Sequence, residues 1–148
     1  MKLSLRQRIS IYINRYIVAY HRLRGCDIGK NTFISKSAIL DRANPKGVHI
    51  GNNSRVLIEA MILAHDYSRG AMGKMWLDTH IGHHCVIGGR SMIMPGLTIG
   101  NHVYVGGGSI VTHNVPDNCV VAGNPAKIRR KGTVISDWGQ IIVKGEKV

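Results

Sequence analysis

The histidines are the residues of this sequence best suited to chemistry, and there are eight of them. An imidazole exchanges protons near neutral pH, so a histidine beside a substrate hydroxyl can act as its general base. His65 has the most distinctive setting, because it stands where a regular pattern stops and a long irregular stretch begins. Such a base works better when a partner fixes its tautomer, and the candidates are Asp66, Glu59 and a backbone carbonyl.

The net charge of the chain is strongly positive, at +12 from 20 Lys and Arg against 8 Asp and Glu. This surplus favours anionic partners: nucleic acid, phospholipid headgroups or a phosphate-bearing cofactor. Aromatic residues make up 5% of the chain and no helix-turn-helix, zinc-finger or aromatic stacking motif is present, so we expect no nucleic-acid partner. Three cysteines without a Cys-x-x-Cys pair favour a reducing, cytoplasmic environment.

An aliphatic repeat with a period of six residues organises most of the chain. Neither a helix nor an alternating strand has this spacing, whereas one flat side of a coil does, and three such sides close a triangular prism. The inward side chains stack from coil to coil, each contributing about 1.5–3 kcal/mol, and the ends of the stack need covers. The repeat positions are Ile28, Ile34, Leu40, Ile50, Val56, Ile62, Ile81, Ile87, Ile93, Ile99, Val105 and Val111.

Two interruptions break the period, a short insert at 41–48 and a loop at 66–78. Insertions into a solenoid project from one face and often form its binding surface. The sequence therefore predicts an all-β solenoid over 26–125 with an extruded loop, followed by a C-terminal cap and tail over 126–148.

Residues 1–25 are predicted to form an N-terminal amphipathic helix with arginines beside its apolar stripe. We expect neither a signal peptide nor a membrane span here. Two roles stay open: packing on the solenoid or on another subunit, and lying on an anionic membrane surface. The apolar stripe consists of Leu5, Ile9, Ile13, Tyr16, Tyr20 and Leu23.

With these motifs, the sequence resembles the hexapeptide-repeat acyltransferases, particularly the sugar O-acetyltransferases of the galactoside, maltose and nodulation type. The resemblance covers residues 28 to about 130. Besides the repeat, it rests on the segment 62–67 before the loop, the block 107–112 and the closing segment 122–127. It implies a left-handed parallel β-helix, a homotrimer with active sites between subunits, and acetyl-CoA as acyl donor without a metal.

The resemblance also implies roles for individual residues. His65 corresponds to the catalytic base, and Glu59 is a further catalytic candidate. The family's donor contacts map onto Gly89, Gly107, Thr112, Lys127 and Arg130, the last two meeting the CoA phosphates. Four loop residues, Asp66, Tyr67, Arg69 and Trp76, are candidates for contacting the acceptor. We therefore expect transfer of an acetyl group to a hydroxyl of a sugar or glycolipid precursor.

Two positions depart from the family pattern. An acceptor-binding Asn of the galactoside-type enzymes would fall near Ser35, and His113 stands where the family often has Lys. Two other functions compete with acyl transfer. A γ-type carbonic anhydrase uses the same prism to hold zinc, but His80, His83 and His84 lack its ligand spacing. The second competing function is a non-catalytic scaffold. A peripheral contact with the inner face of the membrane also stays open.

Overall fold

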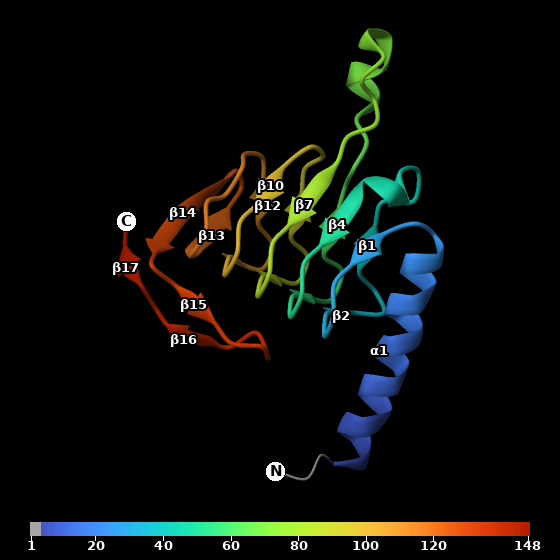
Figure 1. The fold of residues 1–148 in the computed structure, drawn as a ribbon. Helices are drawn as coiled ribbons and strands as arrows, with labels where there is room; N and C mark the ends of the chain where they lie inside the picture. The colour runs from blue at the N-terminus through green and yellow to red at the C-terminus, as the bar shows by residue number, and fades with distance from the viewer. Residues whose placement is uncertain (1–3) are drawn as a thin grey trace.

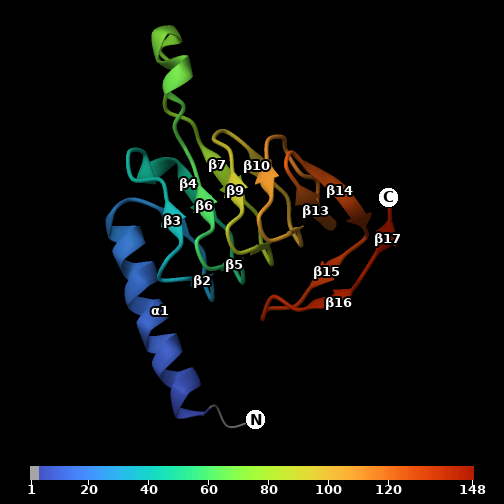
Figure 2. The same cartoon turned by 180° about the vertical axis from the view of Figure 1, so that it is seen from behind.

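The computed structural model describes residues 4–148, so the predicted N-terminal segment 1–25 begins outside the described residues. A helix, α1 (Leu5–Leu23), lies against one end of a stack of coils, and a loop projects from the stack (Figures 1 and 2). The loop carries the 3-10 helix η2 (Tyr67–Met72), and a second one, η1 (Pro45–Gly47), lies in the shorter insert.

The coils have three flat faces, and neighbouring strands within them run parallel until the C-terminal segment is reached. The first face contains β1 (Asp27–Ile28), β4 (Val48–Ile50), β7 (Thr79–Ile81) and β10 (Thr98–Ile99). The second contains β2 (Phe33–Ile34), β5 (Arg55–Val56), β8 (Val86–Ile87), β11 (Tyr104–Val105), β13 (Cys119–Gly123), β14 (Ala126–Lys131) and β17 (Glu146–Lys147). The third contains β3 (Ile39–Leu40), β6 (Met61–Ile62), β9 (Met92–Ile93) and β12 (Ile110–Val111).

The predicted repeat positions form the core of the prism. Ile34, Val56 and Ile87 on the second face are 0% exposed, and the other aliphatic repeat positions are also buried. Their registers match from coil to coil, so that Ile28 pairs with Ile50 and Ile50 with Ile81. The predicted period is therefore confirmed as an inward stack.

The corners between faces require left-handed backbone. At the corner between the first and second faces, Asn31, Asn53, His84 and His102 all have φ between 52° and 56°. This conformation is costly for most residues and is adopted most readily by Gly and Asn. The corner between the second and third faces places Glu59, Arg90 and Gly108 in the same conformation.

The predicted apolar stripe of α1 is exposed rather than packed on the prism. Leu5, Tyr16 and Leu23 are 75%, 76% and 89% exposed. The opposite side of the helix packs on the first coil through Val18 and His21, which are buried.

Polar side chains explain why this side of α1 faces the prism. The Asn14 amide donates to the carbonyl of Thr32 at 3.0 Å and accepts from the amide of Ile34 at 2.9 Å. Arg22 donates to the carbonyls of Ile28 and Gly29. No coil precedes the first one, so its backbone amides and carbonyls would otherwise lack hydrogen-bond partners, which is unfavourable. The helix therefore covers the open end with hydrogen bonds as well as apolar contacts.

The C-terminal segment covers the other end and then turns back. Strand β14 pairs antiparallel with β13, and its Ile128 packs against the core. Beyond it, the hairpin of β15 (Val134–Ile135) and β16 (Ile141–Val143) returns along the corner between the first and second faces, as Figure 1 shows. There, Arg55 donates to the carbonyl of Asp137 at 2.6 Å and its guanidinium lies 5.6 Å from the ring centre of Trp138.

Candidate active site at the root of the loop

The site forms where two parallel strands of the third face end together. Leu40 of β3 pairs with Ile62 of β6, so the residues that follow the two strands lie side by side. Asp41 follows β3 and begins the short insert, while His65 follows β6 and begins the long loop. Both interruptions of the repeat therefore leave the prism at the same corner, between the third and first faces.

Asp41 and His65 form the central contact of the site. His65 Nδ1 lies 2.5 Å from Asp41 Oδ2, and the Asp41 side chain is 0% exposed. The amide of Ala64 also donates to Oδ2, at 2.6 Å. The amides of Ala43 and Asn44 donate to Oδ1, both at 2.9 Å. Every oxygen of this buried carboxylate therefore receives hydrogen bonds.

These contacts determine the protonation of the pair. Burial by itself raises the pKa of Asp41, but the hydrogen bonds from Asn44, Ala64 and His65 outweigh it and hold the pKa below its usual value. Since an ionised carboxylate only accepts, His65 Nδ1 must donate. The neutral ring then keeps its lone pair on Nε2, the nitrogen that a general base needs. At 21% exposure, the His65 side chain is partly open to solvent.

A polar side chain of the short insert holds both legs of the loop. Asn44 donates through Nδ2 to the carbonyls of Ala64 at 2.8 Å and Leu77 at 3.2 Å. Leu77 and Ala64 also pair through the backbone, where the Leu77 amide donates at 2.9 Å. The ascending and descending legs are therefore joined just below His65.

Two predicted acceptor-binding aromatics flank the imidazole. The rings of Tyr67 and His65 meet edge-on with centres 5.0 Å apart, and Trp76 lies 6.3 Å away in a tilted arrangement. Trp76 also bridges His65 through the backbone. Both aromatic side chains are largely exposed, so they present open ring surface beside the base.

The other two predicted acceptor residues are engaged within the loop. Asp66 accepts from the amide and hydroxyl of Ser68 at 2.9 and 2.6 Å, and Arg69 lies 3.1 Å from its carboxylate. The hydrogen bond from the Ser68 hydroxyl is the main cause that lowers the pKa of Asp66. Asp66 therefore caps η2.

Glu59 lies at the other end of β6 from His65. Its carboxylate accepts from Arg90 at 2.6 Å, at the corner between the second and third faces. The orienting partner of His65 is therefore Asp41, while Glu59 and the predicted alternative Asp66 have other partners. The sequence alone does not single out Asp41, because this residue is the first of an irregular insert. A carboxylate directly after a repeat position, followed by Asn44, Pro45 and Gly47, was the available indication.

The predicted donor glycines lie together, but apart from His65. Gly89 and Gly107 occupy successive coils at the corner between the second and third faces, and the amide of Gly108 donates to the carbonyl of Gly89 at 2.9 Å. They precede β9 and β12, whereas His65 follows β6. Because the third face is parallel, the glycines lie at the amino ends of its strands and His65 at the carboxyl ends.

Thr112 follows β12 and so lies at the same end of the third face as His65, on a later coil. Its hydroxyl is 2.9 Å from Nδ1 of the exposed His113. This pair occupies the place where the family often carries a lysine.

The predicted phosphate-binding residues Lys127 and Arg130 both lie on β14. Across a bulge in this strand, Lys127 pairs with Ala122 and Arg130 with Val120, so the two cations lie on the same side of the sheet. Lys127 is exposed, whereas Arg130 is half-buried and donates to the carbonyl of Gly145 at 3.2 Å.

Comparison with known proteins adds to this geometry. Residues 78–113 match the family model described as bacterial transferase hexapeptide (six repeats). These residues carry the hexapeptide repeat of that family. This chain is 33% identical over 103 residues to the putative acetyltransferase YvoF of Bacillus subtilis, covering 68% of this chain and 58% of that one. The prediction of a left-handed parallel β-helix is confirmed by the structure together with this match.

Two solved structures of hexapeptide-repeat proteins are similar to this chain. The polySia-specific acetyltransferase NeuO has a TM-score of 0.59 and 27% identity, covering 74% of this chain and 52% of that one. A hexapeptide-repeat-containing acetyltransferase of Vibrio cholerae, complexed with acetyl coenzyme A, has a TM-score of 0.61 and 29% identity, covering 72% and 60%. This chain spans less than two thirds of YvoF and of both these proteins.

Proposed function

We propose that this protein transfers an acetyl group from acetyl-CoA to a hydroxyl of an anionic sugar or glycolipid, with His65 as general base. The observation that carries the proposal is the hydrogen bond between Asp41 and His65 at the root of the loop. A buried carboxylate that fixes a histidine tautomer beside exposed aromatic rings is suited to proton transfer from a bound sugar.

The reaction is a direct transfer in a ternary complex. Nε2 of His65 takes the proton of the acceptor hydroxyl as its oxygen attacks the thioester carbonyl carbon. The carbon–sulfur bond then breaks, and the thiolate takes a proton from the imidazolium, giving an ester and the free thiol of CoA. Asp41 stays ionised and stabilises the imidazolium between these steps, so we assign it a positioning role.

The donor site is proposed to lie between subunits of a homotrimer. Gly89 and Gly107 lie at the opposite ends of third-face strands from His65, so one prism cannot bring them to one thioester. A neighbouring subunit can supply the glycine corner. Backbone amides there would approach pantetheine closely because no Cβ intervenes, and Lys127 with Arg130 would meet the phosphates. Thr112 is proposed to line the same groove.

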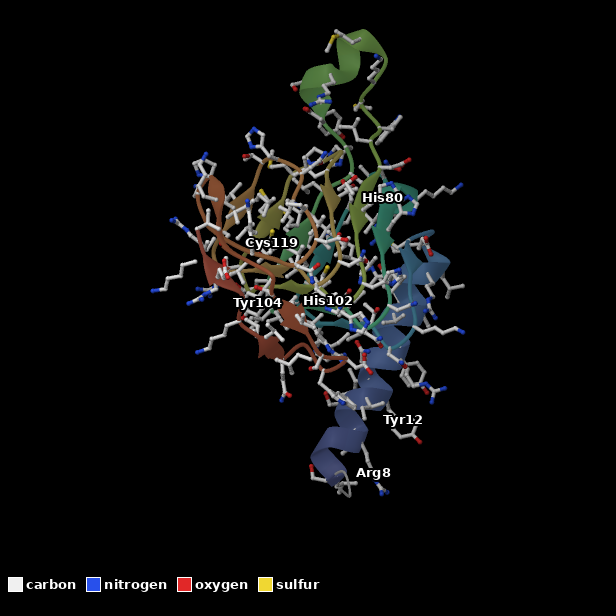
Figure 3. The ribbon with its side chains drawn as sticks, turned by 60° about the vertical axis from the view of Figure 1, so that its left-hand side comes forward. Arg8, Tyr12, His80, His102, Tyr104 and Cys119 are labelled. Atoms are coloured by element: carbon white, nitrogen blue, oxygen red, sulfur yellow. The ribbon has the colours of Figure 1, made fainter. Side chains whose placement is uncertain are left out.

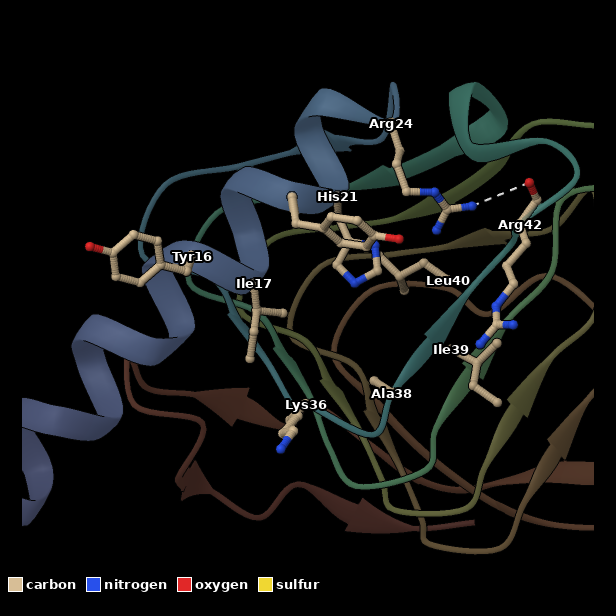
Figure 4. A pocket seen from close by; sticks show the side chains of 10 residues that line it. Tyr16, Ile17, His21, Arg24, Lys36, Ala38, Ile39, Leu40 and Arg42 are labelled. Atoms are coloured by element: carbon tan, nitrogen blue, oxygen red, sulfur yellow. Dashed lines mark hydrogen bonds between the residues drawn. The ribbon is translucent and has the colours of Figure 1, made fainter.

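A groove beside Asp41 favours an anionic acceptor. It lies between α1 and β3, has a volume of about 660 Å³, and is lined by Arg24, Lys36 and Arg42 (Figure 4). Arg42 directly follows Asp41, and Arg24 donates to the carbonyl of Arg42 at 3.2 Å. Three cations at one opening favour a phosphate-linked sugar, such as a lipid-linked precursor of a polysaccharide. The polysaccharide specificity in the name of NeuO is consistent with this substrate class.

The outward face of α1 is proposed to lie on an anionic membrane surface. Leu5, Ile9 and Tyr16 are exposed on the side opposite the prism, and Arg8 and Tyr12 also project from the helix (Figure 3). Apolar residues bordered by arginines match the interfacial zone of an anionic bilayer. Among residues 4–148, no helix has the length and apolar character needed to cross a bilayer. We propose a cytoplasmic location at the inner face of the membrane.

Acetyl-CoA binding and turnover test the proposal in two steps. Calorimetry with acetyl-CoA should show binding by the wild-type protein and by His65→Ala. A thiol-release assay across phosphate-linked sugars should then show turnover that falls at least about 100-fold in His65→Ala. His83 is an exposed histidine at the corner between the first and second faces, so His83→Ala is the matched control and should retain activity.

Three results would each contradict a part of the proposal. Failure of the wild-type protein to bind acetyl-CoA would favour the scaffold alternative. Near-normal turnover in His65→Ala would remove the assigned base while leaving acetyl transfer itself in place. Sedimentation of the wild-type protein as a monomer would contradict the shared donor site.

A further inference from the structure

A cluster of metal-ligating side chains lies on the first face, outside the site described above. His49 of β4 and His80 of β7 pair across neighbouring strands, and their rings stack with centres 4.4 Å apart and an interplanar angle of 11°. Asp78 directly precedes β7 and lies two positions before His80; both side chains are exposed, while Thr79 between them is buried. Figure 3 shows His80 on the outside of the coil.

The ligand atoms of these three residues already converge. One nitrogen of each ring and one oxygen of Asp78 all lie within 4.8 Å of one another. Zinc holds such atoms at about 2.0–2.2 Å, which places ligands about 3.3–3.5 Å apart. Asp78 and His80 are exposed, so their side chains have room to rotate and bring these atoms closer. Among residues 4–148, this is the one cluster of its kind.

The orientation of His49 supports a metal more strongly than proximity does. Its Nδ1 lies 3.3 Å from Asp27 Oδ2, on the neighbouring strand β1, and its Nε2 lies 4.0 Å from Asp78 Oδ1. A metal-bound histidine ordinarily donates its other ring nitrogen to a carboxylate, which fixes the tautomer and leaves the first nitrogen free to bind. Asp27 has this outer position, and Nε2 of His49 points to the centre of the cluster.

From this arrangement we propose that His49, His80 and Asp78 bind a Zn²⁺-class divalent cation, with Asp27 as the outer partner of His49. Two imidazoles and one carboxylate suit zinc, nickel, cobalt or copper, whereas calcium and magnesium take oxygen ligands. Three protein ligands leave a fourth tetrahedral position for water. The site is separate from acetyl transfer, for which His65 acts on the third face without a metal.

The position of the site would let the cation link the descending leg of the loop to the prism. Asp78 is the last residue of the extruded loop, two positions after Trp76, which bridges His65 through the backbone. A cation held by Asp78, His80 and His49 ties the descending leg of the loop to β4. Binding should therefore reduce the mobility of residues 74–78 relative to the metal-free protein.

Calorimetry on untagged, metal-free protein tests the site directly. Zinc chloride should bind with one ion per chain, and magnesium chloride should show no binding. Because loss of an outer partner alone weakens metal binding about 10–100-fold, Asp27→Asn should weaken zinc by that amount and His80→Ala by at least as much. His113→Ala, an exposed histidine outside the cluster, is the control and should bind zinc like the wild type.

Hydrogen exchange supplies a second measurement that does not depend on affinity. Zinc should slow exchange at residues 74–81 in the wild type and leave it unchanged in the His49→Ala, His80→Ala double variant. The proposal is overturned if the wild type binds no zinc, or if the double variant binds as tightly as the wild type. It is also overturned if His113→Ala loses the binding, since adventitious surface histidines would then be responsible. These outcomes are independent of acetyl-CoA binding and turnover.

Discussion

Asp41 and His65 lie 24 positions apart in the sequence and share a 2.5 Å hydrogen bond at the carboxyl ends of two adjacent strands. The contact exists because β3 and β6 run parallel in register and each is followed by an interruption of the repeat. A solenoid normally continues at such a corner. Here the two departing segments leave room for a carboxylate that the backbone amides of both segments surround.

Replacing Asp41 by Asn should mainly affect turnover. The amide no longer stabilises the imidazolium or fixes the Nε2 lone pair, so kcat should fall about 100-fold or more while the KM for acetyl-CoA changes little. Steady-state kinetics on the folded protein measure both quantities. Asp137→Asn, the same change at an exposed position, serves as control. A purely structural role for Asp41 would instead reduce the folded fraction and leave kcat of the remainder unchanged.

The stability of the protein should depend on pH through Asp41. Its pKa in the folded protein lies below 3.8, its value in the unfolded chain, so the unfolded state binds more protons in the range between the two values. The contribution is complete above the unfolded pKa and is lost as pH falls through the folded one. Urea unfolding at a series of pH values should show this loss below about pH 4. Asp41→Asn should show a shallower decline, and an identical decline would contradict the assignment.

Gly47→Ala should disturb the root of the loop. A Cβ at this position would clash with Asn44 Nδ2 and lie 2.5 Å from the Leu77 carbonyl oxygen, so the contact between the two loop legs must shift. We expect a loss of about 1–3 kcal/mol of unfolding free energy, with a drop in turnover. Gly70→Ala is the matched control, because its Cβ meets only the Met75 sulfur at 3.9 Å. Equal effects of the two changes would argue against this contact between the legs.

The central stack should be sensitive to loss of volume. Ile87 is 0% exposed, and Ile87→Ala should lower the unfolding free energy by about 2–5 kcal/mol. The same change at Ile142, which is 63% exposed, should have little effect. Thermal or denaturant unfolding compares the two variants.

Membrane association should depend on the outward face of α1. Replacing Ile9, Ile13 and Tyr16 together by Ser should abolish sedimentation with vesicles that contain anionic phosphatidylglycerol, while the fold is kept because these side chains are 50–76% exposed. Val18→Ser is the contrasting change, since it should weaken packing on the first coil. If the triple variant sediments normally but loses its trimeric state, the stripe is a subunit contact instead.

The repeat could be predicted from the sequence because each inward position carries an aliphatic residue and these positions recur every six residues. Ile34, Val56 and Ile87 carry the period directly, and burial confirms it. His65 could also be singled out, since it stands where the period stops. Its partner could not, because the pairing of Asp41 with His65 depends on how two interruptions meet in space.

The orientation of α1 could not be predicted from the sequence, which left packing on the solenoid and contact with a membrane both open. An apolar stripe is usually taken as the buried side of a helix. In the structure, Asn14 faces the prism because the first coil exposes backbone groups that need partners. The open edge of the first coil needs hydrogen-bond partners, so the side of α1 that faces it carries a polar residue. Apolar periodicity alone would predict that this side of the helix faces solvent.

The long loop enters and leaves the prism without changing the pairing of the strands beside it. Ile50 on β4 aligns with Ile81 on β7 as Ile28 aligns with Ile50, although only the later pair is separated by the 66–78 segment. A segment with this property can be exchanged as a cassette. Acceptor preference could thus diversify by swapping one stretch of chain between related proteins, while the stacked interior evolves under separate constraints.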